Sequence, residues 1–340
     1  MNHTLNLDGI KNLPVWKSAH RLFRILAIYL LVAEIIARTT LGSALPPPSV
    51  GADSFEFDIK VYYLEQSIRQ RGSLDCLIVG DSMANDGPDP RSVEATYQAT
   101  TGKTIHCFNF GMPALTLDAS GPLAEALARR FQPRLLIFIL SARDFDPTYG
   151  AVFRHVADSD WTRYNLGETS IRGWAVNSLY GYRYFLLFNY WLNPSNRVNF
   201  SNSWNNITPQ GFTPLYGYGE PREISAAQHG FEMNFPSAQK GFDQLLQLKH
   251  EGVNLLIVDA PIRPELYLTQ RDDLFNPYIE SMNNIFSPLG IPFWLTRDLA
   301  QTIPNDAWYD YQHVNEKGVP VFSAWLGNQL AENYPPEFFR

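Results

Sequence analysis

Runs of consecutive apolar residues, each closed by a glycine or a polar turn, constrain the fold of this chain more than any other feature. The clearest run is Leu135–Leu140, in which no polar residue occurs. A half-exposed strand alternates apolar and polar residues, whereas a strand covered on both faces is apolar throughout. We therefore predict buried, parallel strands at this run and at less regular ones over 74–79, 105–110, 255–258 and 291–295.

The segments between these runs have the spacing of helices. Leu123, Leu127 and Phe131 follow one another at intervals of four residues, which places them along one face of a helix. Glycines and prolines mark the ends of further helices, which we predict over 90–100, 121–131, 236–250, 274–286 and 319–332. Strands that alternate with helices predict an α/β fold, here a three-layer α/β/α domain with a five-stranded, mostly parallel, doubly wound sheet.

The stretch 145–235 interrupts this alternation and is rich in aromatic residues. It holds four of the eight tryptophans, namely Trp161, Trp174, Trp191 and Trp204. Long irregular stretches inside compact folds are usually functional. We interpret this one as an insertion in a domain made of residues 51–144 and 236–340. Packing over that domain, stacking against sugars and contact with a membrane interface all fit its composition.

Residues 1–50 have the pattern of a membrane anchor. An apolar run over 25–37, interrupted only by Glu34, is followed by three prolines at 46–48 and preceded by the basic residues Lys11, Lys17, Arg21 and Arg24. This order predicts a cytoplasmic tail, a transmembrane signal-anchor helix over 22–41 and a proline-rich spacer. The protein would then be a single-pass membrane protein with an extracytoplasmic main domain. The alternatives are a signal peptide cleaved near the small residues 42–44 and an amphipathic helix packed on a soluble domain.

Charge and cysteine content argue against several other classes. The net charge is −7 and the basic residues form no long stripe, so we predict no nucleic-acid partner. The two cysteines, Cys76 and Cys107, belong to no CxxC or Cys/His cluster, so we predict no metal site and no cofactor. We expect buried, unreactive thiols that serve packing, although neighbouring strands about 4.8 Å apart also allow a disulfide.

Two short polar motifs carry the chemistry. Gly80-Asp81-Ser82 ends the first predicted strand, at the sheet edge where open α/β folds form their sites. A serine there directs its hydroxyl into the crevice, although helix capping also explains such a serine. Asp310 and His313 lie near the C-terminus. A histidine can activate a serine hydroxyl, and an aspartate three residues earlier can hold its other ring nitrogen, although a polar surface loop is also compatible with this pair alone.

Taken in order, these motifs resemble the blocks of the SGNH (GDSL-like) hydrolase superfamily. Gly80-Asp81-Ser82-Met83 is similar to the first block, Gly111 in Asn109-Phe110-Gly111-Met112 to the second-block glycine, and Asp310-x-x-His313 to the last block. The resemblance covers roughly residues 74–330 apart from the insertion. It implies a serine hydrolase that needs no cofactor. The implied triad is Ser82, His313 and Asp310, the implied oxyanion donors are Ser82 and Gly111, and the implied substrate contacts are Asp81, Met83, Asn109 and Asp144.

The third block departs from the family pattern. Ser141-Ala142-Arg143-Asp144 stands where the family usually has Gly-x-Asn-Asp, so Arg143 replaces the asparagine that donates to the oxyanion. A guanidinium can also donate to an oxyanion, bind an anionic substrate group, or pair with Asp144 or Asp146. A buried arginine is costly unless it is paired. We therefore expect Arg143 to line the pocket beside Ser82 and to contribute to the oxyanion hole.

The arginine, together with one N-terminal anchor, makes the chain similar to a subgroup whose members accompany membrane-bound O-acyltransferases in polymer acylation. This resemblance implies an acylated glycan or polymer as substrate, a membrane-bound O-acyltransferase as partner, and esterase or acyl-transfer activity. Two other functions stay open. The chain can be a non-catalytic polymer-binding or assembly protein that retains the hydrolase fold, or an esterase of lipids or small esters.

Overall fold

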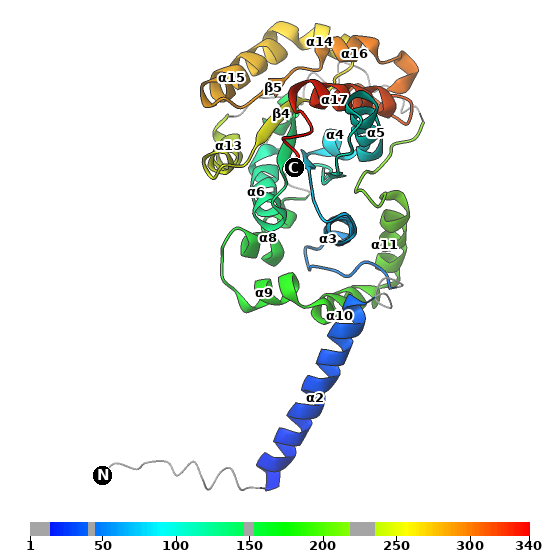
Figure 1. Ribbon diagram of the computed structural model, residues 1–340, viewed down its shortest axis with the longest axis vertical. Coiled ribbons are helices and arrows are strands. Elements are labelled where there is room, and N and C mark those ends of the chain that lie inside the picture. The colour runs from blue at the N-terminus through cyan, green and yellow to red at the C-terminus, as the bar shows by residue number, and fades with distance from the viewer. Residues whose placement is uncertain (1–13, 40–44, 146–152, 218–234) are drawn as a thin grey trace, which may run out of the picture.

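A five-stranded, all-parallel sheet forms the centre of the molecule (Figure 1). The computed structural model describes residues 14–39, 45–145, 153–217 and 235–340. The strands are β1 Cys76–Gly80, β2 Cys107–Asn109, β3 Leu135–Leu140, β4 Leu255–Asp259 and β5 Phe293–Trp294, and their spatial order is β2-β1-β3-β4-β5. The chain thus moves outward from β1 in both directions, which is the doubly wound arrangement. The predicted α/β fold with a parallel sheet is confirmed.

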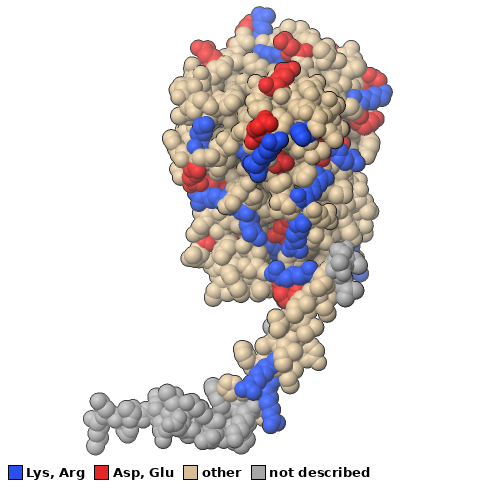
Figure 2. Space-filling model, in the orientation of Figure 1, with Lys and Arg blue, Asp and Glu red and all other residues tan. Residues whose placement is uncertain are grey.

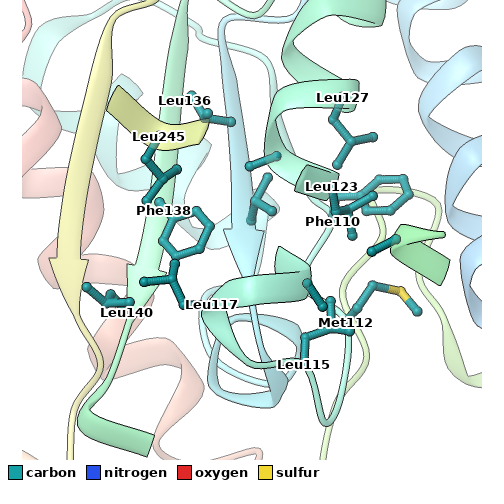
Figure 3. Packing of buried hydrophobic residues seen from close by; sticks show 14 of the residues in the cluster. Phe110, Met112, Leu115, Leu117, Leu123, Leu127, Leu136, Phe138, Leu140 and Leu245 are labelled. Carbon is teal, nitrogen blue, oxygen red and sulfur yellow. The ribbon is translucent and has the colours of Figure 1, made fainter. Parts of the chain in front are cut away.

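Each strand divides its side chains between two buried clusters, because successive residues point to opposite faces of a sheet. On β3, Leu136 and Phe138 belong to one cluster, shown in Figure 3, and Leu135 and Ile137 to the other. The first face is covered by α3 (Phe55–Arg71), α6 (Leu117–Phe131) and α13 (Phe235–His250), and the second by α5 (Pro90–Thr101) and α17 (Val319–Asn333). All positions of β3 are therefore buried, as a continuous apolar run requires.

The remaining helices lie in the insertion or connect the last strands. The insertion contains α7 (Arg154–Ala157), α8 (Asp160–Asn165), α9 (Ile171–Ser178), α10 (Tyr180–Trp191) and α11 (Pro194–Asn206). The last strands are connected by α14 (Pro264–Gln270), α15 (Asn276–Phe286) and α16 (Arg297–Thr302), with a single π turn at Arg271–Phe275 between α14 and α15. The helix predicted over 274–286 is therefore longer and interrupted. The stretch 145–235, read as irregular, is largely helical in its described parts.

The N-terminal helix α2 (Pro14–Arg38) projects away from the rest of the molecule (Figure 1). Among the described residues, no helix is both long and apolar enough to cross a membrane. The end of the helix predicted at residue 41 and the small residues 42–44 lie outside the described residues. The prolines expected to form a spacer pack on the domain instead, because Pro47 and Pro48 are buried and the Val50 N–H donates to Asp58 Oδ1 over 2.8 Å.

The two cysteines form a disulfide, so the expectation of free thiols was wrong. Parallel pairing sets Cys76 directly opposite Cys107 on neighbouring strands, with their Cα atoms 4.5 Å apart. That separation falls within the range that a disulfide can bridge. Both strands were predicted from the sequence, but whether they are neighbours was not, and this pairing decides whether the sulfurs meet.

Removing this bridge should destabilise the protein without altering its fold. Linking residues 31 positions apart restricts the unfolded chain, and such a loop is worth about 2–4 kcal/mol. We expect the Cys76→Ala, Cys107→Ala double variant to lose roughly this free energy of unfolding in urea titrations. Reductant should shift the unfolding midpoint of the parent protein and leave that of the variant unchanged. A parent protein indifferent to reductant would contradict the assignment.

Candidate functional site

A tight turn after β1 presents Ser82. Gly80 has a φ of +152°, and a Cβ at this position would lie 2.5 Å from the Ile139 carbonyl oxygen on β3, so only glycine fits. Asp81 then caps the short helix α4 (Ser82–Asn85), because its Oδ1 accepts the Met83 N–H over 2.8 Å. Asp81 and Met83 are buried, whereas Ser82 between them is partly exposed. The turn therefore directs the serine outward at the carboxyl end of β1.

The structure brings Ser82, His313 and Asp310 together, as predicted. The Ser82 Oγ lies 2.8 Å from His313 Nε2, although 231 residues separate them in sequence. On the other side of the ring, Nδ1 lies 2.9 Å from Asp310 Oδ2 and 3.0 Å from Oδ1. A neutral His313 that donates its Nδ1–H to Asp310 leaves Nε2 free to accept the serine proton. This is the hydrogen-bonding order that activates a serine nucleophile.

The loop that carries the histidine is held by its own polar groups. Asp310 Oδ1 accepts the N–H groups of Gln312 and His313, each over 2.8 Å. Asn315 Nδ2 donates to the carbonyl oxygens of Asp306 and Gly217, over 2.8 and 3.0 Å. Asp310 therefore holds both the backbone and the ring of His313. Asn315 ties the same loop to the chain at Asp306 and Gly217.

Charge around His313 favours its protonated form. Burial lowers the pKa of His313, but the hydrogen bond and charge of Asp310, with further charge from Asp86 and Asp81, outweigh it and raise that pKa above 6.5. Burial likewise raises the pKa of Asp310, but the His313 contact and the two backbone N–H groups lower it to about 2. Asp310 is thus ionised throughout the range in which His313 exchanges its proton.

The glycine expected to supply an oxyanion donor is engaged elsewhere. The Gly111 N–H donates to Asn109 Oδ1 over 2.8 Å, and Asn109 Nδ2 donates to the carbonyl oxygens of Ala84 and Pro88 over 2.7 and 3.0 Å. Asn109 is fully buried, so its side chain ties the second motif to α4 and does not reach a substrate. An added Cβ at Gly111 would lie 2.2 Å from the Asn85 backbone nitrogen, so this glycine is needed for close packing.

Arg143 reaches the loop that carries His313. It lies in the 3-10 turn Ala142–Phe145 that follows β3, and its Nη1 donates to Gln312 Oε1 over 2.9 Å. Its charge also lowers the pKa of the buried Asp81, against the larger effect of burial. The structure thus places Arg143 beside the loop of His313, and a contribution of Arg143 to the oxyanion hole at Ser82 stays a prediction. Asp146, one partner considered for it, lies outside the described residues.

The other side chains expected at the substrate are buried beneath the site. Asp144 is 2% exposed, and its Oδ2 accepts the Ser141 N–H and hydroxyl over 2.7 and 3.1 Å. Burial and the charge of Asp81 raise the pKa of Asp144 well above its usual value. Asp81, Met83, Asn109 and Asp144 are each 4% exposed or less. In this structure they shape the turn and its support and do not line an opening.

A buried lysine beside the site, Lys60, was not among the predicted site residues. Lys60 on α3 is 0% exposed, and its Nζ donates to Gly111 O over 2.5 Å and to Asn85 Oδ1. Burial lowers the pKa of Lys60, while the charges of Glu56 and Asp86 oppose that effect. Lys60 therefore joins α3 to both α4 and the second motif. Its position on the same helical face as Phe57, Val61 and Leu64 is the signal that marks it as buried.

No protein-family model matches this chain, and no curated protein matches it. Among the described residues, no group of three or more histidine, cysteine, aspartate or glutamate side chains is arranged to hold a metal ion.

The protonation of His313 should depend on Asp310. We expect NMR titration of the His313 ring to give a pKa above 6.5, and Asp310→Asn to lower it, because the substitution removes the negative charge that stabilises the imidazolium. Asp306→Asn is the matched control, since Asp306 lies in the same loop but is exposed and paired with Lys317. Equal His313 pKa values in the parent protein and in Asp310→Asn would contradict the assigned coupling.

Proposed function

We propose that this protein is an SGNH-type serine hydrolase or O-acyltransferase that acts on acyl esters of an extracytoplasmic glycan or polymer. The observation that carries the proposal is the continuous hydrogen-bonded series from Ser82 Oγ through the His313 ring to Asp310. Three groups distant in sequence meet in the order that nucleophilic catalysis needs. The resemblance of the sequence blocks to the SGNH superfamily supports the same reaction class.

In the proposed reaction, Ser82 Oγ attacks the ester carbonyl carbon while His313 Nε2 takes the hydroxyl proton. The tetrahedral adduct then breaks its bond to the leaving alcohol, which receives that proton from His313, and an acyl-serine remains. Water or a glycan hydroxyl attacks this acyl group in the second half of the reaction and loses its proton to His313. The bond between the acyl carbon and Ser82 Oγ then breaks, and Ser82 Oγ takes that proton back from His313. Asp310 stabilises the imidazolium in both halves. The chemistry requires no cofactor.

The oxyanion would be held by the Ser82 N–H with help from the Arg143 guanidinium. Arg143 lies beside the histidine loop and its donors already bind a neutral oxygen, that of Gln312. A developing negative charge is a better acceptor than an amide oxygen, so the guanidinium can shift toward it in the transition state. Gly111 would join these donors only if Asn109 released its N–H.

We further propose that the protein is attached to a membrane through α2, with the catalytic domain outside the cytoplasm. The described side chains of α2 include large apolar residues that are exposed along its length, such as Leu22 (69%), Ile28 (61%) and Leu31 (60%). The disulfide favours an oxidising, extracytoplasmic environment. A membrane-bound O-acyltransferase as partner follows from the resemblance to the polymer-acylating subgroup.

A non-catalytic polymer-binding protein with the hydrolase fold is the second candidate. One observation favours it, namely that the Gly111 N–H is already bonded to Asn109 and is not directed at an oxyanion. The intact contact between Ser82 and His313 favours the enzyme. Reactivity of the serine separates the two candidates, because a binding protein has no reason to keep an activated nucleophile.

Ser82 should react with a fluorophosphonate probe. Its oxygen would displace fluoride from phosphorus, and we expect labelling of the parent protein, none of Ser82→Ala, and unchanged labelling of Ser67→Ala as a matched surface control. Labelling should increase as the pH rises through the raised pKa of His313, since the hydrogen bond and charge of Asp310 raise that pKa against the opposing effect of burial and only the neutral ring can accept the proton. Peptide mapping by mass spectrometry identifies the modified serine. An unlabelled parent protein would favour the binding candidate.

Replacing Arg143 should lower turnover of a chromogenic acyl ester. Loss of one oxyanion donor typically costs on the order of 10²–10³ in turnover, which we expect for Arg143→Ala. Arg143→Lys tests whether a point charge suffices or the planar donor pair is needed. Arg271→Ala, which changes an exposed arginine on the π turn, should keep full activity. Full activity of both Arg143 variants beside an inactive Ser82→Ala would make Arg143 a purely structural residue.

A further inference from the structure

Helix α10 has its polarity reversed relative to a helix on the surface of a soluble domain. Its buried face carries Tyr180, Arg183, Tyr184 and Leu187, at intervals of three and four residues. Its exposed side carries Phe185 and Phe188, and Leu192 directly follows the helix; these three side chains are 63%, 52% and 80% exposed. A surface helix normally places apolar residues inward and charged residues outward. On α10 the charged residue is inside and large apolar residues are outside.

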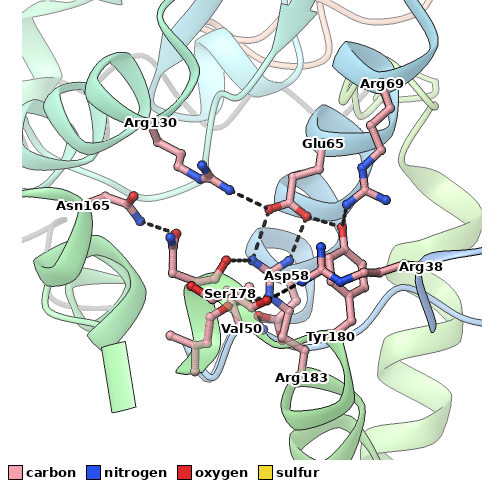
Figure 4. A network of polar contacts seen from close by, with 12 residues as sticks. Arg38, Val50, Asp58, Glu65, Arg69, Arg130, Asn165, Ser178, Tyr180 and Arg183 are labelled. Atoms are coloured by element: carbon pink, nitrogen blue, oxygen red, sulfur yellow. Dashed lines mark hydrogen bonds and ion pairs between the residues drawn. The ribbon is translucent and has the colours of Figure 1, made fainter. Parts of the chain in front are cut away.

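Arg183, on the buried face of α10, makes all of its described hydrogen bonds to groups within the protein. Arg183 is 1% exposed, and it pairs with Glu65 through contacts of 2.7 and 3.1 Å, as Figure 4 shows. It also donates to the carbonyl oxygens of Val176 and Asn177. A buried ion pair with its hydrogen bonds satisfied holds α10 in one rotational setting. The apolar outer face is therefore fixed in place and does not result from a loosely packed helix.

Helix α2 leaves the molecule from this same place. Glu34, the charge that interrupts its apolar run, accepts the N–H groups of Tyr180 and Gly181 over 3.0 and 2.7 Å and so caps α10. Arg38 pairs with Glu34 over 2.6 Å and lies over the Tyr180 ring. Glu34 and Arg38 thus face α10, while Ile35 and Ile36 between them are 53% and 43% exposed.

Helix α9 adds exposed apolar side chains to the same end of the molecule. Ile171 and Trp174, one turn apart, are 88% and 48% exposed. Figure 1 shows α9 and α10 side by side at the end from which α2 projects, and Figure 2 shows α2 without charge along its middle. We call Ile171, Trp174, Phe185, Phe188 and Leu192 the platform. Its tryptophan and phenylalanines are residues that favour the interface of a bilayer.

We infer that the platform lies on a lipid bilayer and that the occupant of its apolar face is the interfacial layer of lipid. The inference extends the proposed membrane attachment through α2 and does not depend on catalysis. A bilayer covers the projecting apolar helix and the platform at its base together. A second protein copy seated on the platform would leave α2 itself in water. The domain would therefore rest on the membrane at a fixed orientation, in addition to being tethered to it.

The test exploits the cysteine content. Both cysteines of the chain are in the disulfide, so an introduced cysteine is the single free thiol. Phe188→Cys and Leu192→Cys report on the platform, and Leu31→Cys reports on α2. Leu268→Cys is the matched control, because Leu268 is an equally exposed apolar residue (64%) on α14 at the opposite end of the molecule (Figure 1). Each full-length variant carries an environment-sensitive fluorophore in phosphatidylcholine–phosphatidylglycerol vesicles with or without nitroxide lipids.

We expect nitroxide lipids to quench the labels at 188, 192 and 31 severalfold and to leave the label at 268 unchanged. Quenching at 31 alone would overturn the platform contact and keep the anchor. Absence of quenching at 31 and at the platform would overturn both membrane proposals. A shielded but unquenched label at 188 would mean that protein covers the face, which also overturns the inference. Fluorophosphonate labelling of Ser82 in the same samples shows independently whether the proposed catalysis stands.

Discussion

The pairing of β1 with β2 on one side and with β3 on the other is the constraint on which the site depends. Because β1 lies between β2 and β3, the segment after Gly80 leaves the sheet at the point where the strand order reverses, between helices on opposite faces. The second and third motifs follow β2 and β3, and therefore emerge beside the nucleophile. The histidine loop needs only to reach this one point. The geometry of the sheet thus brings four sequence blocks together at Ser82, although they are far apart in the chain.

Buried polar side chains then hold these sequence blocks in place around Ser82. Asn109 connects the second motif to α4, Asn315 anchors the histidine loop, and Lys60 ties both α4 and Gly111 to α3. Each of these side chains would be costly to bury unless its hydrogen bonds were made. Their partners are mostly backbone oxygens, which cannot move without the turns that contain them. A site supported in this way holds the Ser82 hydroxyl at a defined distance from the His313 ring.

The sequence identified the elements whose residues obey a simple periodicity and missed those in which charge is buried. The continuous run Leu135–Leu140 is a strand with the predicted bounds, since burial on both faces leaves no room for polar residues. Helix α3 was not predicted, and three of its charged residues, Asp58, Lys60 and Glu65, are buried. In the sequence, Glu34 only interrupts an apolar run. Its role as a cap could not be predicted, because its partners on α10 lie 146 and 147 residues away.

The triad could be predicted because its residues follow recognisable blocks, whereas its surroundings could not. The contact of Arg143 with Gln312 joins residues 169 positions apart, and no local pattern indicates it. The engagement of the Gly111 N–H by Asn109 depends on how the turn after β2 closes. The disulfide likewise depends on strand register. Spacing along the chain specifies which groups approach the site, and tertiary contacts specify which of their hydrogen bonds remain available.

The cap that Glu34 places on α10 has a practical consequence for shortening the chain. A version that begins after Arg38 would lose the acceptor for the Tyr180 and Gly181 N–H groups, and would also uncover the ring of Tyr180. The uncapped N-terminus of α10 would then fray. Because α10 carries the exposed side chains of Phe185 and Phe188, its loosening would favour self-association in water. Retaining residues 34–38, or supplying an acidic residue in their place, would keep the N-terminus of α10 capped in a shortened chain.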